Sequence, residues 1–186
     1  MSFEPSLKLL HSPGACSFPN LILARVGQMT PEFASINPKR RVPVLAIDNE
    51  VITEMSAVLT SISSLAPEKN LLGRSTIETI RVYEWLNWLS TVVHSQAMGS
   101  IWRTERYSND PAVYPAIREK GLETIRECYA MINEKVAEPG TGFAVGKGFT
   151  AVDPFLLVLY CWASRLEKDM GQDYPVLCGL REEASW

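Results

Sequence analysis

Residues 37–58 constrain the fold of this chain more than any other segment. They read Asn-Pro-Lys-Arg-Arg-Val-Pro-Val-Leu-Ala-Ile-Asp-Asn-Glu-Val-Ile-Thr-Glu-Met-Ser-Ala-Val. The order predicts a strand led by Val42, a tight turn at residues 48–49, a second strand, and a helix that opens at Glu54. The start of a helix offers free backbone N–H groups that attract anions, and Glu54 can pair with an ammonium group. This stretch is therefore suited to bind the charged ends of a small peptide.

Apolar periodicity places strands in the first third of the chain and helices in the rest. A buried strand is predicted at residues 7–11, and the hairpin described above adds two more. Helices are predicted at about residues 16–26, 75–99, 111–136 and 151–169. Such segregation is typical of a small α/β domain beside an all-helical domain. We expect the first domain at residues 1–68 and the second at residues 74–186.

The composition is that of an ordinary globular protein with a formal net charge of −3. A slightly acidic chain is a poor partner for nucleic acid, because phosphate binding needs a basic surface. The longest apolar run, residues 154–163, is too short to span a bilayer, and residues 2–5 lack the basic start and apolar core of a secretory signal. The four cysteines show neither metal-ligand spacing nor a disulfide-dense pattern. We therefore expect a cytoplasmic protein with free thiols, no metal site, and no membrane or nucleic-acid partner.

The motifs form an ordered set. It consists of a strand, Pro-Gly-Ala-Cys-Ser at 13–17, a helix, Asn-Pro-Lys-Arg-Arg-Val-Pro-Val-Leu at 37–45, the hairpin, Thr-Glu at 53–54, Tyr-Glu-Trp-Leu-Asn-Trp at 83–88, His94, and Gly-Phe-Thr-Ala-Val-Asp at 148–153. This set resembles the bacterial beta class of the glutathione transferases over about residues 7–165. The resemblance implies a thioredoxin-like first domain packed on a helical second domain, glutathione as cosubstrate, a hydrophobic small-molecule substrate, and a homodimer.

Three departures from the family pattern suggest a specialised enzyme. Only nine residues separate Gly27 from Asn37, too few for the family's second strand and its connecting loop, so we expect that edge strand to be missing. Met55 stands where the family has serine or glycine, which removes a hydroxyl from the γ-glutamyl carboxylate but leaves the backbone N–H. The chain ends at Trp186, soon after the last long helix, so we expect a shortened cover over the second-substrate pocket.

Three residues are candidates to activate the sulfur of glutathione. Cys16 stands at a predicted helix start, where the dipole and free amides favour a thiolate, although a small space-filling residue would also fit there. Ser17 is either a hydroxyl donor to the glutathione thiolate or only an N-cap. The resemblance implies that His94 approaches the sulfur and transfers a proton, while a histidine near a helix C-terminus is also ordinary. No second cysteine lies three positions from Cys16, which argues against a thioredoxin-type dithiol cycle.

The residues expected to bind glutathione are Arg41, Val42, Pro43, Glu54, Met55 and Ser56. The resemblance implies a cis peptide bond between Val42 and Pro43, which turns the backbone of Val42 toward the cysteinyl part of the ligand. The segment that begins at Glu54 is expected to hold the γ-glutamyl group, although it also fits the first turn of an ordinary amphipathic helix. Arg41 is expected to pair with the glycine carboxylate, although the basic run at 39–41 is also typical of a solvated face.

Aromatic and capping residues of the second half carry weaker signals. Trp88, Trp102 and Tyr107 either line a hydrophobic substrate pocket or belong to the core, which is the commoner place for aromatic residues at helical spacing. Thr150 and Asp153 are expected to be structural, a hydroxyl that caps a helix with an acidic residue three positions on.

The favoured hypothesis is an enzyme that aims the glutathione thiolate at an electrophilic or conjugated small molecule. Addition or substitution leaves a conjugate, whereas reversible addition to a conjugated alkene permits bond rotation before elimination returns glutathione. The missing strand and short tail resemble compact transferase-like enzymes of fungal secondary metabolism, including the trans–cis isomerase of the pseurotin pathway, and we favour isomerisation of an unsaturated metabolite. The alternatives are a conjugating transferase, a non-catalytic interaction module with the transferase fold, and a thiol–disulfide exchanger that uses Cys16.

Overall fold

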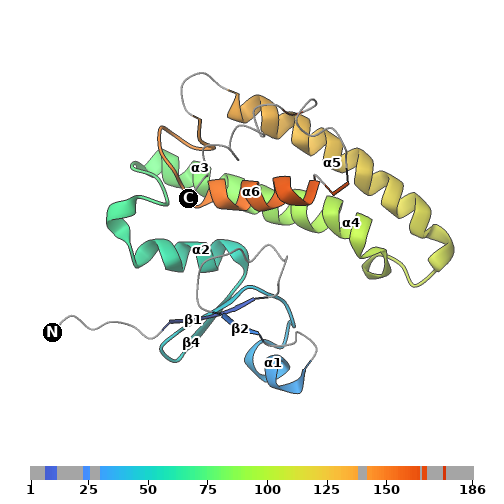
Figure 1. Ribbon diagram of the computed structural model, residues 1–186, viewed down its shortest axis with the longest axis horizontal. Helices are drawn as coiled ribbons and strands as arrows, with labels where there is room; N and C mark the ends of the chain where they lie inside the picture. Colours follow the sequence, from blue (N-terminus) through green and yellow to red (C-terminus); the bar gives the residue numbers. More distant parts are fainter. Residues whose placement is uncertain are drawn as a thin grey trace. The chain divides into compact units, whose positions relative to one another are not determined.

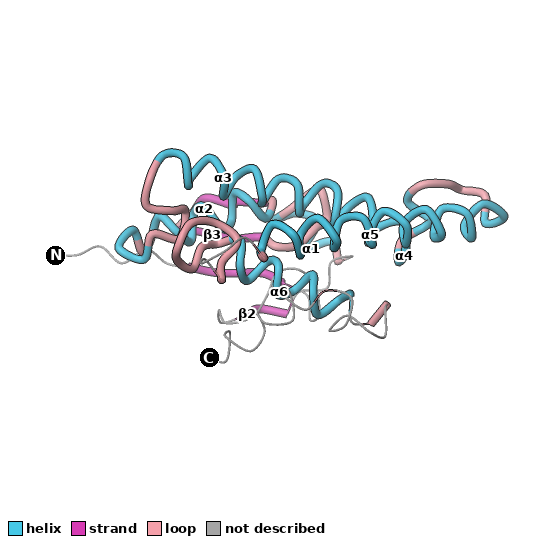
Figure 2. Tube along the Cα trace, turned by 90° about the horizontal axis from the view of Figure 1, so that it is seen from above, coloured by secondary structure: helices cyan, strands magenta, loops and turns pink. Residues whose placement is uncertain are grey.

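The computed structural model describes residues 7–11, 23–25, 30–137, 142–163, 165–166 and 174. The chain forms two compact units, Met1–Asn70 and Leu71–Trp186 (Figures 1 and 2). In the described ranges, the strands belong to the first unit and the long helices to the second.

The first unit is built on a four-stranded sheet in the order β2-β1-β3-β4 (Figure 1). Its strands are β1 (Leu7–His11), β2 (Leu23–Arg25), β3 (Val44–Ile47) and β4 (Glu50–Thr53). β1 runs parallel to β2 and antiparallel to β3, and β3 and β4 form the hairpin expected around residues 48–49. Asp48 has a φ of 53° in that turn, a conformation that Asp and Asn adopt more readily than other non-glycine residues. This sheet, parallel at one edge and antiparallel at the other, is thioredoxin-like.

The structure corrects the expectation of a missing edge strand. β2 is that strand, and it pairs with β1, with Leu9 opposite Leu23. It precedes Gly27 and lies inside the helix expected at 16–26, so the helix prediction is wrong at residues 23–25. Leu, Ala and Arg favour helices, and three residues are too few to show the two-residue period of a strand. Pairing with β1 therefore overrides the local preference.

Two helices of the first unit pack on opposite faces of the sheet. They are α1 (Pro31–Ile36) and α2 (Met55–Ser64), and a 3₁₀ turn, η1 (Pro67–Lys69), follows. Leu45 of β3 packs against Val58 of α2, whereas Val44 packs against Phe33 of α1. Neighbouring residues of a strand point to opposite faces, so α2 and α1 cover different sides. The hairpin and the two helices thus fix both ends of the loop at residues 37–43.

The second unit is helical, as expected, in its described part. Its elements are α3 (Thr76–Trp88), η2 (Leu89–Met98), α4 (Gly99–Trp102), η3 (Thr104–Arg106), η4 (Pro111–Val113), α5 (Tyr114–Val136) and α6 (Val152–Ala163). α3, η2 and α4 follow one another directly, but η2 is a π-helix of ten residues. π-Helices are rare and frequently mark functional sites. The helix expected at 151–169 is shorter, because α6 ends at Ala163 and residues 165–166 form a turn.

Gly121 allows α5 to lie close to η2 and α4. A Cβ atom at Gly121 would lie 2.9 Å from the Cβ of Ser100 and 3.0 Å from the carbonyl oxygen of Ala97. Nearby, the Nε of Arg118 donates to the carbonyl oxygen of Ile101 at 3.1 Å. The main chains of the two helical segments therefore approach each other more closely than a larger residue at position 121 would permit.

Thr150 and Asp153 form the start of α6 as predicted. The Asp153 carboxylate accepts from the N–H of Thr150 at 2.7 Å, from its hydroxyl at 3.0 Å, and from the N–H of Ala144 at 2.9 Å. Burial raises the pKa of Asp153, and these hydrogen bonds oppose the rise. The pair is a capping arrangement.

In the parts of the chain that the structure covers, no helix combines the length and apolar character needed to cross a membrane. Among those same residues, no three His, Cys, Asp or Glu side chains lie together as possible metal ligands.

Candidate functional site

Glu54 joins β4 to α2 in an unusual conformation. Its φ and ψ are 74° and 136°, in a region that residues with a Cβ rarely occupy. No described side chain caps α2, and the carbonyl oxygen of Glu54 accepts the N–H of Val58 at 2.9 Å. The first N–H groups of α2, on the half-buried Met55 and Ser56, therefore remain open to an anion, as the sequence predicted.

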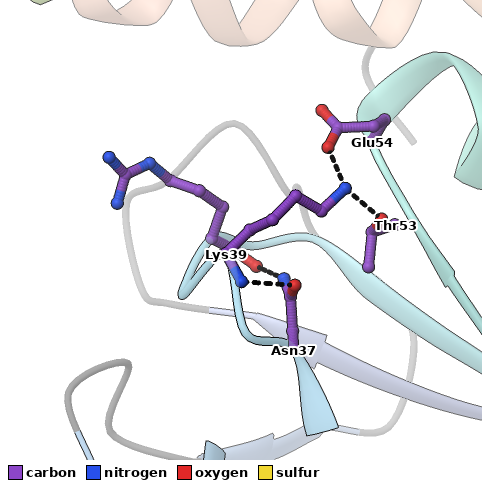
Figure 3. Close-up of polar contacts among 5 residues, drawn as sticks. Asn37, Lys39, Thr53 and Glu54 are labelled. Atoms are coloured by element: carbon purple, nitrogen blue, oxygen red, sulfur yellow. Dashed lines mark hydrogen bonds and ion pairs between the residues drawn. The ribbon is translucent and has the colours of Figure 1, made fainter. Parts of the chain in front are cut away.

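Lys39 pairs with Glu54. The sequence did not single out Lys39 as a site residue. Its ammonium forms an ion pair with the Glu54 carboxylate and donates to the hydroxyl of Thr53 at 2.6 Å (Figure 3). In the β3–β4 hairpin, Val44 lies opposite Thr53, so the loop before β3 comes beside the end of β4. That hairpin register was predictable and could have placed the basic run near Glu54.

The loop between α1 and β3 contains the other binding residues predicted in this region. The peptide bond between Val42 and Pro43 is cis, which confirms that prediction. Pro43 is buried, and Val42 packs against the cluster of Phe33 and Val44. The side chain of Arg41 is exposed. Arg41, Val42 and Glu54 therefore lie in the same unit, around one end of the β3–β4 hairpin.

Cys16 and Ser17, the two sulfur-activating candidates of the first unit, lie outside the described residues. Their roles remain predictions.

His94 lies in the π-helix η2 of the second unit, within a row of aromatic rings. The centroid of its ring is 5.4 Å from that of Trp162, which in turn is 5.3 Å from Trp102. Burial lowers the pKa of His94 below its ordinary value of 6.5, and the positive charge of Arg106 lowers it further. The imidazole is therefore neutral at pH 7, the form that can accept a proton.

The aromatic candidates of the second unit do not form one group. Trp102 joins the row of rings at His94, whereas Trp88 lies against Trp85 with 5.5 Å between ring centroids. The hydroxyl of Tyr107 donates to the carbonyl oxygen of Ser95. Trp162 was not predicted as a site residue, since α6 gave only the signal of a strongly apolar helix.

The chain is similar to glutathione transferases in both sequence and structure. No protein-family model matches the chain. The glutathione S-transferase GST-4.5 of Xanthomonas campestris pv. campestris is 23% identical over 178 residues, which cover 88% of this chain and 86% of that protein. A glutathione transferase homolog from Sulfitobacter, solved with bound glutathione, is 22% identical and has a TM-score of 0.84 over 97% of this chain and 93% of its own.

This chain has the glutathione transferase fold. A bacterial beta class glutathione S-transferase from Sphingomonas chungbukensis has a TM-score of 0.79 at 22% identity, over 96% of this chain and 92% of that one. Bacterial glutathione transferases are thus among the proteins that this chain resembles in sequence and in fold. The sequence is also similar to elongation factor 1-gamma 3 of Oryza sativa subsp. japonica, with 25% identity over 81% of this chain but only 35% of that protein.

Proposed function

We propose that this chain is an enzyme that binds glutathione and directs its thiolate onto an electrophilic or conjugated small molecule. The observation that carries the proposal is the ion pair between Lys39 and Glu54 beside the uncapped start of α2. Glutathione has one ammonium group and two carboxylates. The first unit brings together one carboxylate, the free amides at the start of α2, and a cation that is paired with that carboxylate.

In the proposed complex the γ-glutamyl end of glutathione lies at the start of α2. Its ammonium pairs with Glu54 in place of Lys39, and its carboxylate accepts from the N–H groups of Met55 and Ser56. Lys39, once released, and Arg41 are cations available to the glycine carboxylate. The backbone of Val42, next to Pro43, faces the cysteinyl part of the ligand, as the family resemblance implies.

The sulfur is proposed to be activated by the three residues that the sequence singled out. Cys16 or Ser17 stabilises the thiolate as a thiol beside the sulfur or as a hydroxyl donor. His94 exchanges the proton, which its neutral imidazole supports. The proposed chemistry requires no metal and no cofactor besides glutathione.

We propose isomerisation as the favoured outcome and conjugation as the alternative. In both, the thiolate forms a carbon–sulfur bond. In isomerisation, that bond breaks again after rotation and the electron pair returns to sulfur. One argument for isomerisation, the missing strand, no longer holds because β2 is present. Isomerisation therefore rests only on the resemblance to compact transferase-like enzymes of fungal secondary metabolism, and a product assay decides. A conjugated polyene incubated with enzyme and glutathione is expected to give its geometric isomer and no stable adduct, whereas adducts alone would leave conjugation.

Calorimetry with glutathione tests the binding proposal. Wild type is expected to bind, and Glu54→Gln to bind roughly 10-fold to 100-fold more weakly, the range for one hydrogen bond to a charged group. Glu50→Gln is the matched control, because Glu50 is an exposed carboxylate at the other end of β4, and it should bind like wild type. Absence of binding heat from wild type at millimolar glutathione would overturn the proposed function.

A non-catalytic interaction module is the second candidate, favoured by the similarity to elongation factor 1-gamma 3. It predicts a folded chain without affinity for glutathione, so the same titration separates the two.

We also propose that the chain forms a homodimer and resides in the cytoplasm. Ile77 and Ile80 support the dimer, because these apolar side chains lie on one face of α3 and are 59% and 55% exposed. The buried Cys128 is a free thiol, which suits a reducing compartment.

A further inference from the structure

We infer that Asn37 is a positioning residue of the proposed glutathione site, and that its side chain holds the loop at residues 37–41 so that Lys39 stands opposite Glu54. The inference rests on the proposed function, since it assigns Asn37 a part in that same site.

Asn37 ties the end of α1 to the basic loop through four hydrogen bonds. Its side-chain Nδ2 donates to the carbonyl oxygen of Arg41 at 2.7 Å, and its Oδ1 accepts the N–H of Lys39 at 3.1 Å (Figure 3). Its own N–H donates to the carbonyl oxygen of Phe33 at 2.8 Å, and its carbonyl oxygen accepts the N–H of Arg40 at 2.9 Å. The residue is only 1% exposed, so an amide without these partners would be costly there.

The end of α1 does not itself require an asparagine. Asn37 has φ and ψ of −134° and 99°, an extended conformation that any residue adopts. A left-handed helix cap, the usual reason for asparagine at this place, is therefore absent at Asn37. The side chain serves the loop that follows, where its bond to the N–H of Lys39 closes an Asx-turn.

The hydrogen bonds of the Asn37 side chain fix the main chain from which the Lys39 side chain extends. Within the loop, Arg40 has a φ of 52°, in the left-handed region, and it lies between the two residues whose backbone groups bind the Asn37 side chain. Lysine has a long flexible stem, and an anchored main chain reduces the conformations that it loses when its ammonium pairs with an anion. Lys39 can then exchange Glu54 for a ligand carboxylate without rearrangement of the loop.

A double-mutant cycle on the intact chain tests this role by calorimetry with glutathione. Asn37→Ala is expected to weaken binding about tenfold, the effect of one hydrogen-bonded contact. In a Lys39→Met background, Asn37→Ala should weaken binding less than about twofold, because the loop held by Asn37 then carries no ammonium to position. Asn109→Ala, an exposed asparagine of the second unit, is the control and should match wild type.

Asn37→Ser keeps the interpretation independent of folding, because it places no charge at this buried position. Its hydroxyl can still accept the N–H of Lys39 but no longer donates to Arg41, so its affinity should fall between those of wild type and Asn37→Ala. It replaces Asn37→Ala in the cycle if that variant does not melt cooperatively. Unchanged affinity in the Asn37 variants, or equal weakening with and without Lys39, would overturn the positioning role while glutathione binding stands. If wild type gives no heat, the proposed function and this inference both fail.

Discussion

Burial acts on Asp153 and His94 in opposite directions, because one is charged when it loses a proton and the other when it gains one. The pKa of Asp153 is raised, and three hydrogen bonds from Thr150 and Ala144 hold the rise back. The pKa of His94 is lowered, first by burial and then by Arg106. Asp153 is thus kept as a structural acceptor, whereas His94 is kept neutral beside an aromatic row.

The lowered pKa of His94 predicts a pH-dependent stability. Above its ordinary value of 6.5, the imidazole is neutral in both the folded and the unfolded chain and contributes no pH dependence. Below that value the unfolded chain takes up the proton first, so the free energy of unfolding falls until the lowered pKa of the folded state is passed. Urea unfolding between pH 7.5 and pH 5 should therefore show a steeper loss in wild type than in His94→Gln.

The diagnostic quantity is the slope of the free energy of unfolding against pH. The absolute free energy of unfolding at one pH is not diagnostic. Loss of the ring contact with Trp162 lowers the stability of His94→Gln at every pH by a similar amount and cancels in the slope. Parallel profiles for the two proteins would contradict the burial of a neutral imidazole.

The site residues show which part of residue-level chemistry could be predicted from the sequence. The place of Glu54 at a helix start follows from the local motif, and the cis bond before Pro43 follows from the family resemblance; the structure has both. Lys39 and Asn37 could not be found in the same way, because a basic run and an Asn-Pro pair are common on surfaces. Their significance comes from the register of β3 and β4, which brings the end of one strand to the start of the other.

At the scale of elements, long helices were predictable and short or irregular pieces were not. The strong apolar period gave α5 and the start of α6 within a few residues. β2 has three residues and no period of its own, so only its pairing with β1 makes it a strand. The π-helix η2 carries the same apolar residues as an α-helix, and its hydrogen-bond pattern leaves no mark in composition.

Close packing between α5 and η2 predicts that Gly121→Ala destabilises the second unit. Alanine favours a helix over glycine by about 1 kcal/mol. The added Cβ would nevertheless meet Ser100 at 2.9 Å and a backbone oxygen of Ala97 at 3.0 Å, and overpacking costs about 1–3 kcal/mol. A net loss of about 1 kcal/mol is expected in the free energy of unfolding.

Gly99→Ala provides the matched comparison. The new Cβ would meet only the hydroxyl of Tyr107, at 2.6 Å, which is the end of a side chain that can swing aside. Denaturant titrations should rank Gly121→Ala as the less stable variant. A Gly121→Ala protein more stable than wild type would show that the helices can separate freely.

At the scale of the molecule, the apolar surface of α3 is the feature that the chain alone does not explain. Ile77 and Ile80 are three positions apart and mostly exposed, and an ion pair between Arg81 and Glu84 lies on the same helix at 2.7 Å. Exposed apolar residues on one helix face, next to charges of both signs, suit an interface that pairs with its own copy. The fold class could be predicted from the segregation of strands and helices. The exposed apolar surface of α3 could not be predicted in this way.

Replacement of Ile77 and Ile80 by glutamate is expected to convert the proposed dimer to a monomer. Four carboxylates would then face one another across a two-fold interface, where like charges repel. Size-exclusion chromatography with light scattering measures the mass directly. Met131→Glu is the control, because Met131 is 44% exposed on α5 and its substitution should leave the dimer intact. A dimer that survives the double substitution would place the interface elsewhere.

The pairing of Lys39 with Glu54 also bears on which molecules the proposed site rejects. The protein supplies its own counter-ion, so a simple amine would have to replace a tethered ammonium and would leave Lys39 without a partner. A zwitterion that brings a second acid group gives the displaced lysine a new anion, so both exchanged charges are satisfied. Polyamines and other simple cations should therefore compete poorly with glutathione, even though the group that recognises the ligand's ammonium, Glu54, is acidic.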